Sequence, residues 1–388
     1  MSKFRYLVLG SGMQGRACGY YFSKFGDAKE IGMADISMDV AQKAAERVNA
    51  LSSSTLAKAI QIDAKNHASL VQTFKNYDAV LSAIDYSLNV DITKAAIEAG
   101  IHLVDLGGNT DIVKAQLKLN DAAKSKNVSI VPDCGLAPGL GNTLAAYGME
   151  MLDETEEVQI RCGGLAQEPK PPLDYKLVFS IRGLTNEYLG KAWVLRNSKV
   201  AEIDTFSELE SIDFEAPVGR CEAFVTTGGS STCPWTFENK VKTYEYKTVR
   251  YPGHYDKFKC MVDLGLLDLE PVEVNGVPVV PREIFHKLAP AKLDFPGDKD
   301  LVVLRATCVG IKSGKRKAYQ FDLMLFQDED TGFTAMEMGT GYPAALVLIH
   351  AARGQTPKGV VSLEKALNHD IYMEELIKNG LPIKKTES

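Results

Sequence analysis

The first 133 residues alternate between short apolar runs and longer stretches rich in Ala, Lys, Glu and Leu. The apolar runs are typical of buried strands and lie at 5–9, 31–34, 59–62, 79–84, 102–106 and 128–131. Stretches of helical character lie between most of them, at 38–50, 67–75, 91–99 and 111–126. This alternation predicts right-handed crossovers, and therefore an α/β fold with a doubly wound parallel sheet.

The pattern changes between about residue 155 and residue 335. Strand-like runs lie at 158–162, 176–181, 222–226, 241–248, 301–309 and 316–326, and the last two are expected to form a hairpin across 312–315. Helix signals are fewer and lie at 186–189, after Tyr255 and at 282–288. We expect a second, α+β domain with a mostly antiparallel or mixed sheet.

The C-terminal region changes once more. Gly339-Thr340-Gly341-Tyr342-Pro343 precedes an apolar segment, 344–352, that is predicted to be helical and too short to cross a membrane. A nearly all-apolar helix must be buried on most sides, so we expect it to pack on the first domain. The first domain would then be discontinuous, with residues 1–133 and 337–388 flanking a second domain of residues 134–336.

Composition narrows the function classes. The net charge of −6 disfavours nucleic acid or an anionic membrane as the main partner. The seven cysteines are scattered, without paired spacing or a Cys/His pattern for a metal, and indicate reduced thiols in a cytoplasmic protein. The chain starts directly with a predicted strand, so no targeting leader is expected.

A glycine-rich turn follows the first predicted strand. Gly10, Gly12 and Gly15 have the spacing G-x-G-x-x-G, and Met13 and Gln14 lie between the last two. Gly10 permits a tight turn, Gly12 lets a pyrophosphate approach the backbone, and Gly15 lets the helix lie close to the strand. The flanking strand and helix favour a dinucleotide-binding Rossmann turn over a purely structural glycine turn.

Asp35 lies twenty residues after Gly15, at the end of the second apolar run. An acid at this position binds the ribose hydroxyls of the adenosine. Ile36 and the residue after it provide no Arg or Lys for a 2′-phosphate, and Asp35 would repel one. The sequence therefore predicts NAD as the cofactor in preference to NADP.

Other candidate cofactor contacts lie at later strand ends. Asp63 either faces the adenine or caps a helix. Ala83 and Ile84 either line the nicotinamide ribose or belong to the sheet core.

Residues 132–143 are dense in Gly and Pro and follow the sixth predicted strand. They form either one wall of a cleft between the domains or a simple linker, and the position at the ligand edge favours the wall. Within this hinge, Asp133 could bind substrate or tune a base, or act as a turn residue. Cys134 is expected to line the cleft.

Several of these blocks together resemble the saccharopine dehydrogenase/reductase superfamily. They are Gly10–Gly15, Asp105–Asn109, Pro132–Gly139, Lys247–His254 and Gly339–Pro343, in matching order. Within the superfamily they are most similar to the L-lysine 6-dehydrogenases. The resemblance implies NAD-dependent oxidation at a C–N bond, here of L-lysine to 2-aminoadipate 6-semialdehyde, ammonia and NADH. It also implies a second domain that binds substrate and builds a homodimer.

This chemistry needs a base for the amine and a group that holds the amino-acid carboxylate. His254 is the base candidate because it follows a Tyr-Pro-Gly turn, although a surface histidine is the alternative. Arg250 and Arg182 are candidates for the carboxylate, or are structural ion pairs, and Tyr251 is a candidate wall residue. No zinc motif is present, and no metal is expected.

Two other functions remain open. A related dehydrogenase could act on a secondary amine, as in saccharopine or carboxynorspermidine, and would need more than one Arg in the cleft. A non-catalytic dinucleotide-binding protein is also compatible with the fold.

Overall fold

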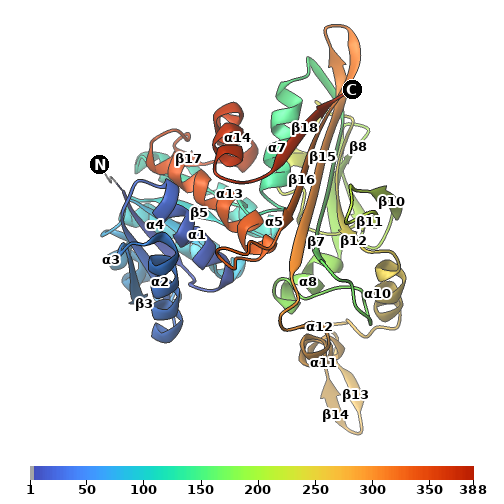
Figure 1. Cartoon of the computed structure of the whole chain (residues 1–388), viewed down its shortest axis with the longest axis horizontal. Coiled ribbons are helices and arrows are strands. Elements are labelled where there is room, and N and C mark those ends of the chain that lie inside the picture. The colour runs from blue at the N-terminus through green and yellow to red at the C-terminus, as the bar shows by residue number, and fades with distance from the viewer. Residues whose placement is uncertain (1–3) are drawn as a thin grey trace.

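Seven parallel strands form the first sheet of the computed structural model, which describes residues 4–388 (Figure 1). Their spatial order is β17-β6-β5-β4-β1-β2-β3. The strands are β1 Phe4–Leu9, β2 Ala28–Asp35, β3 Ala57–Gln61, β4 Ala79–Ser82, β5 His102–Asp105, β6 Ser129–Val131 and β17 Gly359–Val360. The six predicted strands are confirmed. The two-residue strand β17 is too short to leave a periodic signal in the sequence.

Helices cover both faces of this sheet. They are α1 Met13–Phe25, α2 Met38–Ser52, α3 His67–Phe74, α4 Asn89–Ala99, α5 Thr110–Leu117 and α6 Asn120–Ser125, with a short 3₁₀ turn, η1, at Tyr86–Leu88. Ser37, Asn66 and Asn109 each accept a backbone N–H at a helix start, as N-cap residues do. The single helix predicted at 111–126 is two helices, α5 and α6.

The second sheet is mixed and has nine strands, in the order β10-β11-β12-β7-β15-β16-β18, with β8 paired to β12 and β9 paired to β8. The strands are β7 Glu154–Ala166, β8 Lys191–Arg196, β9 Lys199–Asp204, β10 Glu210–Asp213, β11 Arg220–Val225, β12 Thr243–Arg250, β15 Asp300–Lys312, β16 Lys315–Phe326 and β18 Ile383–Glu387. The predicted β15–β16 hairpin is confirmed. The strand predicted at 176–181 is wrong, because this segment pairs with no strand and leads into helix α8.

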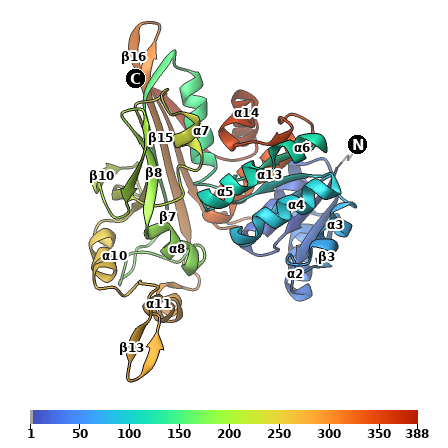
Figure 2. The same ribbon diagram turned by 180° about the vertical axis from the view of Figure 1, so that it is seen from behind.

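Shorter elements surround the second sheet. They are α7 Leu140–Glu150, α8 Ile181–Tyr188, α9 Cys233–Thr236, α10 His254–Asp263, α11 Pro281–Leu288, α12 Pro290–Leu293, α14 His369–Lys378, the 3₁₀ turn η2 Leu363–Lys365 and the hairpin β13 Val272–Val274 with β14 Val277–Val279. Figure 2 shows α7 and α14 on the side of the second sheet that faces the first sheet.

Helix α13, Ala335–Ala352, lies between the two sheets (Figure 1). It is longer than the predicted apolar segment because Thr334 and Glu337 form a capping box at its start, so Gly339–Pro343 lie inside the helix. Gly341 brings its backbone close to Ala17 and Cys18 of α1, which is the expected contact with the first sheet. The chain then places β17 in the first sheet and β18 beside β16 in the second. The division into domains at residues 133 and 337 stays a prediction.

Membrane-spanning helices, metal-binding clusters and cysteine pairing can be assessed over the described residues. Across residues 4–388, no helix has both the length and the apolar character that a bilayer crossing requires. In the same range, no group of three or more His, Cys, Asp or Glu side chains is placed to hold a metal ion. All seven cysteines are free, and all but Cys260 are buried.

Candidate active site between the two sheets

The glycine turn lies where the strand order of the first sheet reverses, with β2 on one side of β1 and β4 on the other. This is the position at which doubly wound sheets bind dinucleotides. Gly10 has a φ of +98°, and a Cβ on Gly15 would lie 1.9 Å from the Gly10 carbonyl oxygen. A Cβ on Gly12 would meet nothing within 4 Å, so the backbone there is open to a ligand. Met13, the first residue of α1, is 42% exposed beside it.

Asp35 ends β2 and is half-buried. Its carboxylate accepts the backbone N–H of Ser11 and of Ser37, each at 3.0 Å, and this fixes the acid beside the glycine turn. The Ile36 side chain points outward and is 67% exposed. The residues present therefore fit a dinucleotide whose pyrophosphate meets the start of α1 and whose ribose meets Asp35.

The other candidate cofactor residues have different surroundings. Ala83 and Ile84 follow β4 and pack against Gly10, since a Cβ on Gly10 would lie 2.6 Å from the Ala83 carbonyl oxygen. Asp63 is exposed and accepts the backbone N–H of Lys65 at 2.9 Å, so it shapes a turn. The N-cap of the following helix α3 is Asn66.

A cavity of about 240 Å³ lies between this ligand edge and the second sheet. Its walls come from both units: α1, residues 106 and 135–138, strands β7 and β12, and helices α8 and α13. The lining side chains that carry charge or hydrogen-bonding groups are Gln14, Glu187, Tyr246, Arg250 and Thr340. The residues at 135–138 confirm that the hinge forms one wall, as its position in the sequence indicated.

Arg250 is the cation of this cavity and is 2% exposed. Its Nε donates to the Tyr188 hydroxyl at 2.6 Å, and its Nη1 donates to the Val249 carbonyl oxygen at 2.8 Å. These bonds use two of the five N–H groups of the guanidinium. Three N–H groups remain, enough for the two-pronged bond that a carboxylate accepts.

Glu187 is the acid of the cavity, and the sequence reasoning missed it. Its carboxylate lies 4.0 Å from Arg250 Nη2 and accepts the hydroxyl of Thr248. Thr248 also shares a hydrogen bond with the Tyr246 hydroxyl, at 3.1 Å. Burial raises the pKa of Tyr246 well above its usual value, so this phenol stays protonated. A cation and an anion thus lie side by side in the cavity wall.

His254 does not line the cavity. It is the first residue of α10, not part of an exposed turn, and it is fully buried. Its Nδ1 lies 3.0 Å from the Leu173 carbonyl oxygen and its Nε2 lies 3.0 Å from the Tyr188 hydroxyl. Burial and the Arg250 charge lower its pKa to about 3. His254 therefore supports Tyr188, which in turn supports Arg250, and it has no access to a substrate proton.

Two other candidates for substrate binding also lie outside the cavity wall. Arg182 has a side chain that is 65% exposed and forms an ion pair with Glu283, at 2.9 Å. Tyr251 donates its hydroxyl to the Ala166 carbonyl oxygen at 2.9 Å, and burial raises its pKa to about 12. Of the two arginines considered from the sequence, the structure places only Arg250 in the cavity.

Asp133 and Cys134 are buried behind the hinge. The Asp133 carboxylate accepts the backbone N–H of Gly108 at 3.1 Å and the Ser231 hydroxyl at 2.5 Å, which joins the two units. Burial, and then the neighbouring Asp105, raise the pKa of Asp133 to about 7. Burial raises the pKa of the Cys134 thiol well above its usual value, and its Sγ contacts the Val131 carbonyl oxygen at 3.3 Å. Neither side chain lines the cavity.

Gln14 lies where the glycine turn meets the cavity. It belongs to the glycine turn and also lines the cavity, where its Nε2 donates to the Met336 carbonyl oxygen at 3.3 Å. Its Oε1 is buried, and within residues 4–388 it has no hydrogen-bond partner. The amide oxygen is therefore an unsatisfied acceptor on a side chain of the cavity wall.

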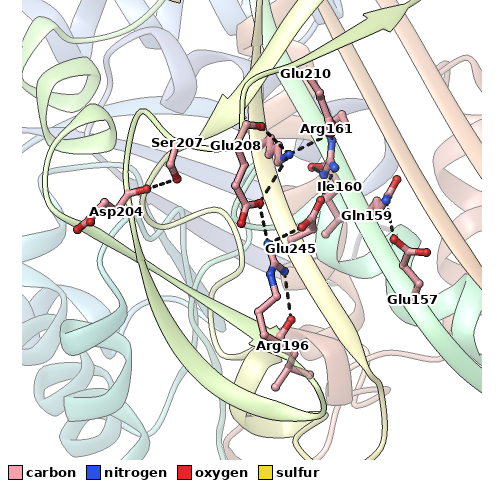
Figure 3. Close-up of polar contacts among 12 residues, drawn as sticks. Glu157, Gln159, Ile160, Arg161, Arg196, Asp204, Ser207, Glu208, Glu210 and Glu245 are labelled. Atoms are coloured by element: carbon pink, nitrogen blue, oxygen red, sulfur yellow. Dashed lines mark hydrogen bonds and ion pairs between the residues drawn. The ribbon is translucent and has the colours of Figure 1, made fainter. Parts of the chain in front are cut away.

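The opposite face of β7 and β12 carries a separate group of charges. Figure 3 shows Arg161 between Glu210 and Glu245, and Arg196 beside Glu245 and Glu208. Burial opposes ionisation of Glu245, but the Arg161 guanidinium prevails and holds its pKa below the usual value. These charges satisfy one another and attach the segment before β10 to the sheet, so we assign them a structural role.

Comparison with protein-family models assigns both parts of the chain to one family. The model described as the saccharopine dehydrogenase C-terminal domain matches residues 135–381, and the model described as the saccharopine dehydrogenase NADP binding domain matches residues 6–131. The chain belongs to the saccharopine dehydrogenase family. This confirms the resemblance at the level of the superfamily.

Two curated relatives illustrate the distance within the family. Saccharopine dehydrogenase [NADP(+), L-glutamate-forming] of Schizosaccharomyces pombe is 26% identical over 282 residues, which cover 68% of this chain and 58% of the relative. Mitochondrial alpha-aminoadipic semialdehyde synthase of Mus musculus is 24% identical over 355 residues, covering 73% of this chain and 37% of the relative. The chain spans little more than half the length of the first relative.

Two solved structures share the fold. Apo saccharopine dehydrogenase (L-Glu forming) from Saccharomyces cerevisiae has a TM-score of 0.80 at 18% identity, with all of both chains covered. Homospermidine synthase from Legionella pneumophila in complex with NAD has a TM-score of 0.64 at 14% identity, with 100% of this chain and 92% of the other covered. Both confirm the two-sheet architecture of this saccharopine dehydrogenase family member.

Proposed function

We propose that this family member is an NAD-dependent amine dehydrogenase that deaminates the side chain of L-lysine. The products would be 2-aminoadipate 6-semialdehyde, ammonia and NADH. The observation that carries the proposal is the pairing of Arg250 with Glu187 in a cavity of about 240 Å³. An amino-acid head group has a carboxylate and an ammonium on one carbon, which matches a cation and an anion 4.0 Å apart.

In this arrangement Arg250 binds the α-carboxylate and Glu187 binds the α-ammonium. The side chain of lysine then extends toward Gln14, at the edge where the cofactor binds. The ε-ammonium loses its proton to solvent, and the Gln14 Oε1 accepts an N–H of the neutral amine and so orients the ε-carbon. Bound NAD supplies the acceptor for the hydride that leaves this carbon. Water then adds to the iminium, and ammonia departs.

A saccharopine-type reaction on a secondary amine is the second candidate. The names of the curated relatives favour it, and so does a neighbouring hollow that Lys191 and Arg282 line. Saccharopine carries three carboxylates, however, and among the described residues Arg250 is the one cationic side chain lining the cavity of about 240 Å³. This single cation supports the smaller substrate.

NAD is the proposed cofactor because of Asp35. Its carboxylate lies where the 2′-phosphate of NADP would be placed, and the exposed neighbour Ile36 offers no positive charge. The family model and the Schizosaccharomyces pombe relative carry NADP in their descriptions, whereas the homospermidine synthase structure contains NAD. The free cysteines lead us to propose a reducing compartment, the cytoplasm.

A substrate panel tests the proposal. Purified protein is offered L-lysine, saccharopine, ornithine and cadaverine, each with NAD or NADP, and the reduced cofactor is followed by absorbance. The proposal predicts turnover of lysine with NAD and release of ammonia. Glutamate release from saccharopine would establish the second candidate instead, and no reduction with any amine would favour a dinucleotide-binding protein without turnover.

A further inference from the structure

His254 is fully buried, and both nitrogens of its ring have partners. Its Nδ1 lies 3.0 Å from the carbonyl oxygen of Leu173, and a carbonyl oxygen can only accept a hydrogen bond. Nδ1 therefore carries the hydrogen. In a neutral ring the other nitrogen, Nε2, is then an acceptor, so the Tyr188 hydroxyl at 3.0 Å donates to it.

The surroundings of His254 keep its ring neutral. A charged ring would also donate from Nε2, so the Tyr188 oxygen would accept from His254 and from Arg250, and the Tyr188 hydrogen would lose its acceptor. The Arg250 cation on the other side of Tyr188 opposes a second positive charge. Burial and this charge lower the pKa of His254 to about 3.

The direction of this hydrogen-bond chain determines what Arg250 presents to the cavity. Because Tyr188 donates to His254, its oxygen is free to accept the Arg250 Nε–H, at 2.6 Å. Arg250 Nη1 gives one hydrogen to the Val249 carbonyl oxygen. The three N–H groups that remain are on Nη1 and Nη2, at the end of the side chain, where a carboxylate can accept two of them side by side.

Aromatic rings hold the same side chains in place. The Cζ of Arg250 lies 5.0 Å from the ring centroid of Tyr175 and 5.5 Å from that of Tyr188, and a cation is attracted to such rings. The ring of Phe258 stacks on His254, with centroids 5.6 Å apart. The three aromatic residues are at most 1% exposed. Rotation of the guanidinium would therefore require the surrounding core to move.

The turn before His254 fixes the start of the chain of hydrogen bonds. Gly253 is the N-cap of α10 and has a φ of +89°, a left-handed conformation that favours glycine. The carboxylate of Glu222, on β11, accepts the backbone N–H of Gly253 at 3.0 Å and that of Tyr255. An acid at a helix N-terminus stabilises its first turn. The Tyr-Pro-Gly-His sequence therefore places the histidine ring precisely within the core.

We propose that His254 and Tyr188 are positioning residues that orient Arg250 for the α-carboxylate of the substrate. The proposal rests on the proposed function, in which Arg250 binds that carboxylate, but not on which amine is oxidised. Neither positioning residue lines the cavity. The head group is bound in the same way in the substrate complex and in the transition state, so loss of either residue should raise KM and leave kcat nearly unchanged.

Two substitutions of His254 test the direction of the chain of hydrogen bonds. In His254→Gln the amide oxygen can take the place of Nε2 and accept from Tyr188. In His254→Asn the amide reaches only the place of Nδ1, so the Tyr188 hydroxyl loses its acceptor. KM for L-lysine should rise about 10-fold or more in His254→Asn and in Tyr188→Phe, with kcat changed less than about twofold. In His254→Gln, KM should stay within about threefold of wild type.

Tyr251→Phe is the matched control. The Tyr251 hydroxyl is bonded to the Ala166 carbonyl oxygen at 2.9 Å, outside the cavity wall, so its removal should leave KM and kcat unchanged. Circular dichroism and the Kd for NADH check that each variant is folded. An unchanged KM in His254→Asn, equal increases in His254→Asn and His254→Gln, or a lower kcat at unchanged KM would each overturn the proposal.

A measurement without substrate separates this proposal from the proposed function. Protein labelled with ¹⁵N at histidine is studied by NMR, and the His254 signals are assigned by their absence from His254→Gln. We expect hydrogen on Nδ1 and none on Nε2; hydrogen on Nε2 would overturn the proposal. If the wild type oxidises saccharopine instead of lysine, the proposed function fails and the same variants are compared with saccharopine. If it oxidises no amine, the position of the hydrogen alone decides.

Discussion

The side chain of Arg250 provides the sharpest test of how the cavity recognises its substrate. Replacing it by lysine keeps the positive charge and removes the planar fork. We expect Arg250→Lys to keep one charge-assisted hydrogen bond to the substrate carboxylate and to lose the other. Such a bond is worth about 1.5–3 kcal/mol, so kcat/KM for L-lysine should fall by about 10-fold to 150-fold.

The assay compares two substrates that differ in one group. Initial rates of NADH formation are measured with L-lysine and with cadaverine, which has the same amines and no carboxylate. The loss should be confined to lysine, because cadaverine makes no bond to Arg250. Arg182→Lys is the matched control: its guanidinium is exposed and paired with Glu283, so its rates should not change.

Arg250→Lys also changes the structure of the site, and the comparison of the two substrates separates this effect from the loss of carboxylate binding. Arg250 also bonds Tyr188 and the Val249 carbonyl oxygen, and lysine cannot keep both contacts. If the variant merely distorts the site, rates with lysine and cadaverine should fall together. Equal losses with both substrates, or an unchanged KM for lysine, would refute Arg250 as the carboxylate holder.

Other side chains give three further predictions. Glu187→Gln should lower kcat/KM for L-lysine about 10-fold to 100-fold. With 6-aminohexanoate, which lacks the α-amine, kcat/KM should fall less than about threefold, and equal decreases for the two substrates would show that Glu187 does not bind the α-ammonium. Asp35→Ser combined with Ile36→Arg should shift the preference from NAD toward NADP by at least about 100-fold, since repulsion of the 2′-phosphate is replaced by an arginine bond; an unchanged ratio of kcat/KM values would contradict the role of Asp35. Asp133 has a folded-state pKa raised from 3.8 to about 7, so its stabilisation is complete below pH 3.8 and is lost as pH rises through 7. Relative to wild type, Asp133→Asn should therefore gain up to about 4 kcal/mol of unfolding free energy between pH 4 and pH 8, measured by urea denaturation; a difference that is independent of pH would show that Asp133 is not buried in a neutral form.

Much of the first sheet could be predicted because its strands are buried on both faces and its glycine turn has fixed spacing. Six strands and the cofactor edge follow from those local signals. Strand β17 could not be found, since its two residues pair only through tertiary structure. The start of α13 could have been predicted from the sequence, because Thr334 and Glu337 have the spacing of a capping box. The prediction placed the helix at 344–352 instead, because it relied on the apolar run there.

The candidate site shows where local reasoning fails. Arg250 could be found because arginine suits a carboxylate, but its neighbour His254 was judged from a turn motif. That motif starts a buried helix, and the histidine ends one layer behind the cavity. No local sequence motif identifies Glu187 as a site residue, because only the packing of α8 against β12 directs its carboxylate toward Arg250. Which face of a short helix meets the cleft depends on contacts between distant segments.

The central claim is that the ε-amine of L-lysine is the group oxidised. Purified protein with NAD and ¹⁵N-labelled lysine tests it, with the label at the ε-nitrogen in one sample and at the α-nitrogen in another. Ammonium and NADH are measured together. Oxidation at the ε-carbon gives one labelled ammonium per NADH from ε-labelled lysine and unlabelled ammonium from α-labelled lysine. Release of the α-label, or NADH formed without ammonium, would contradict it.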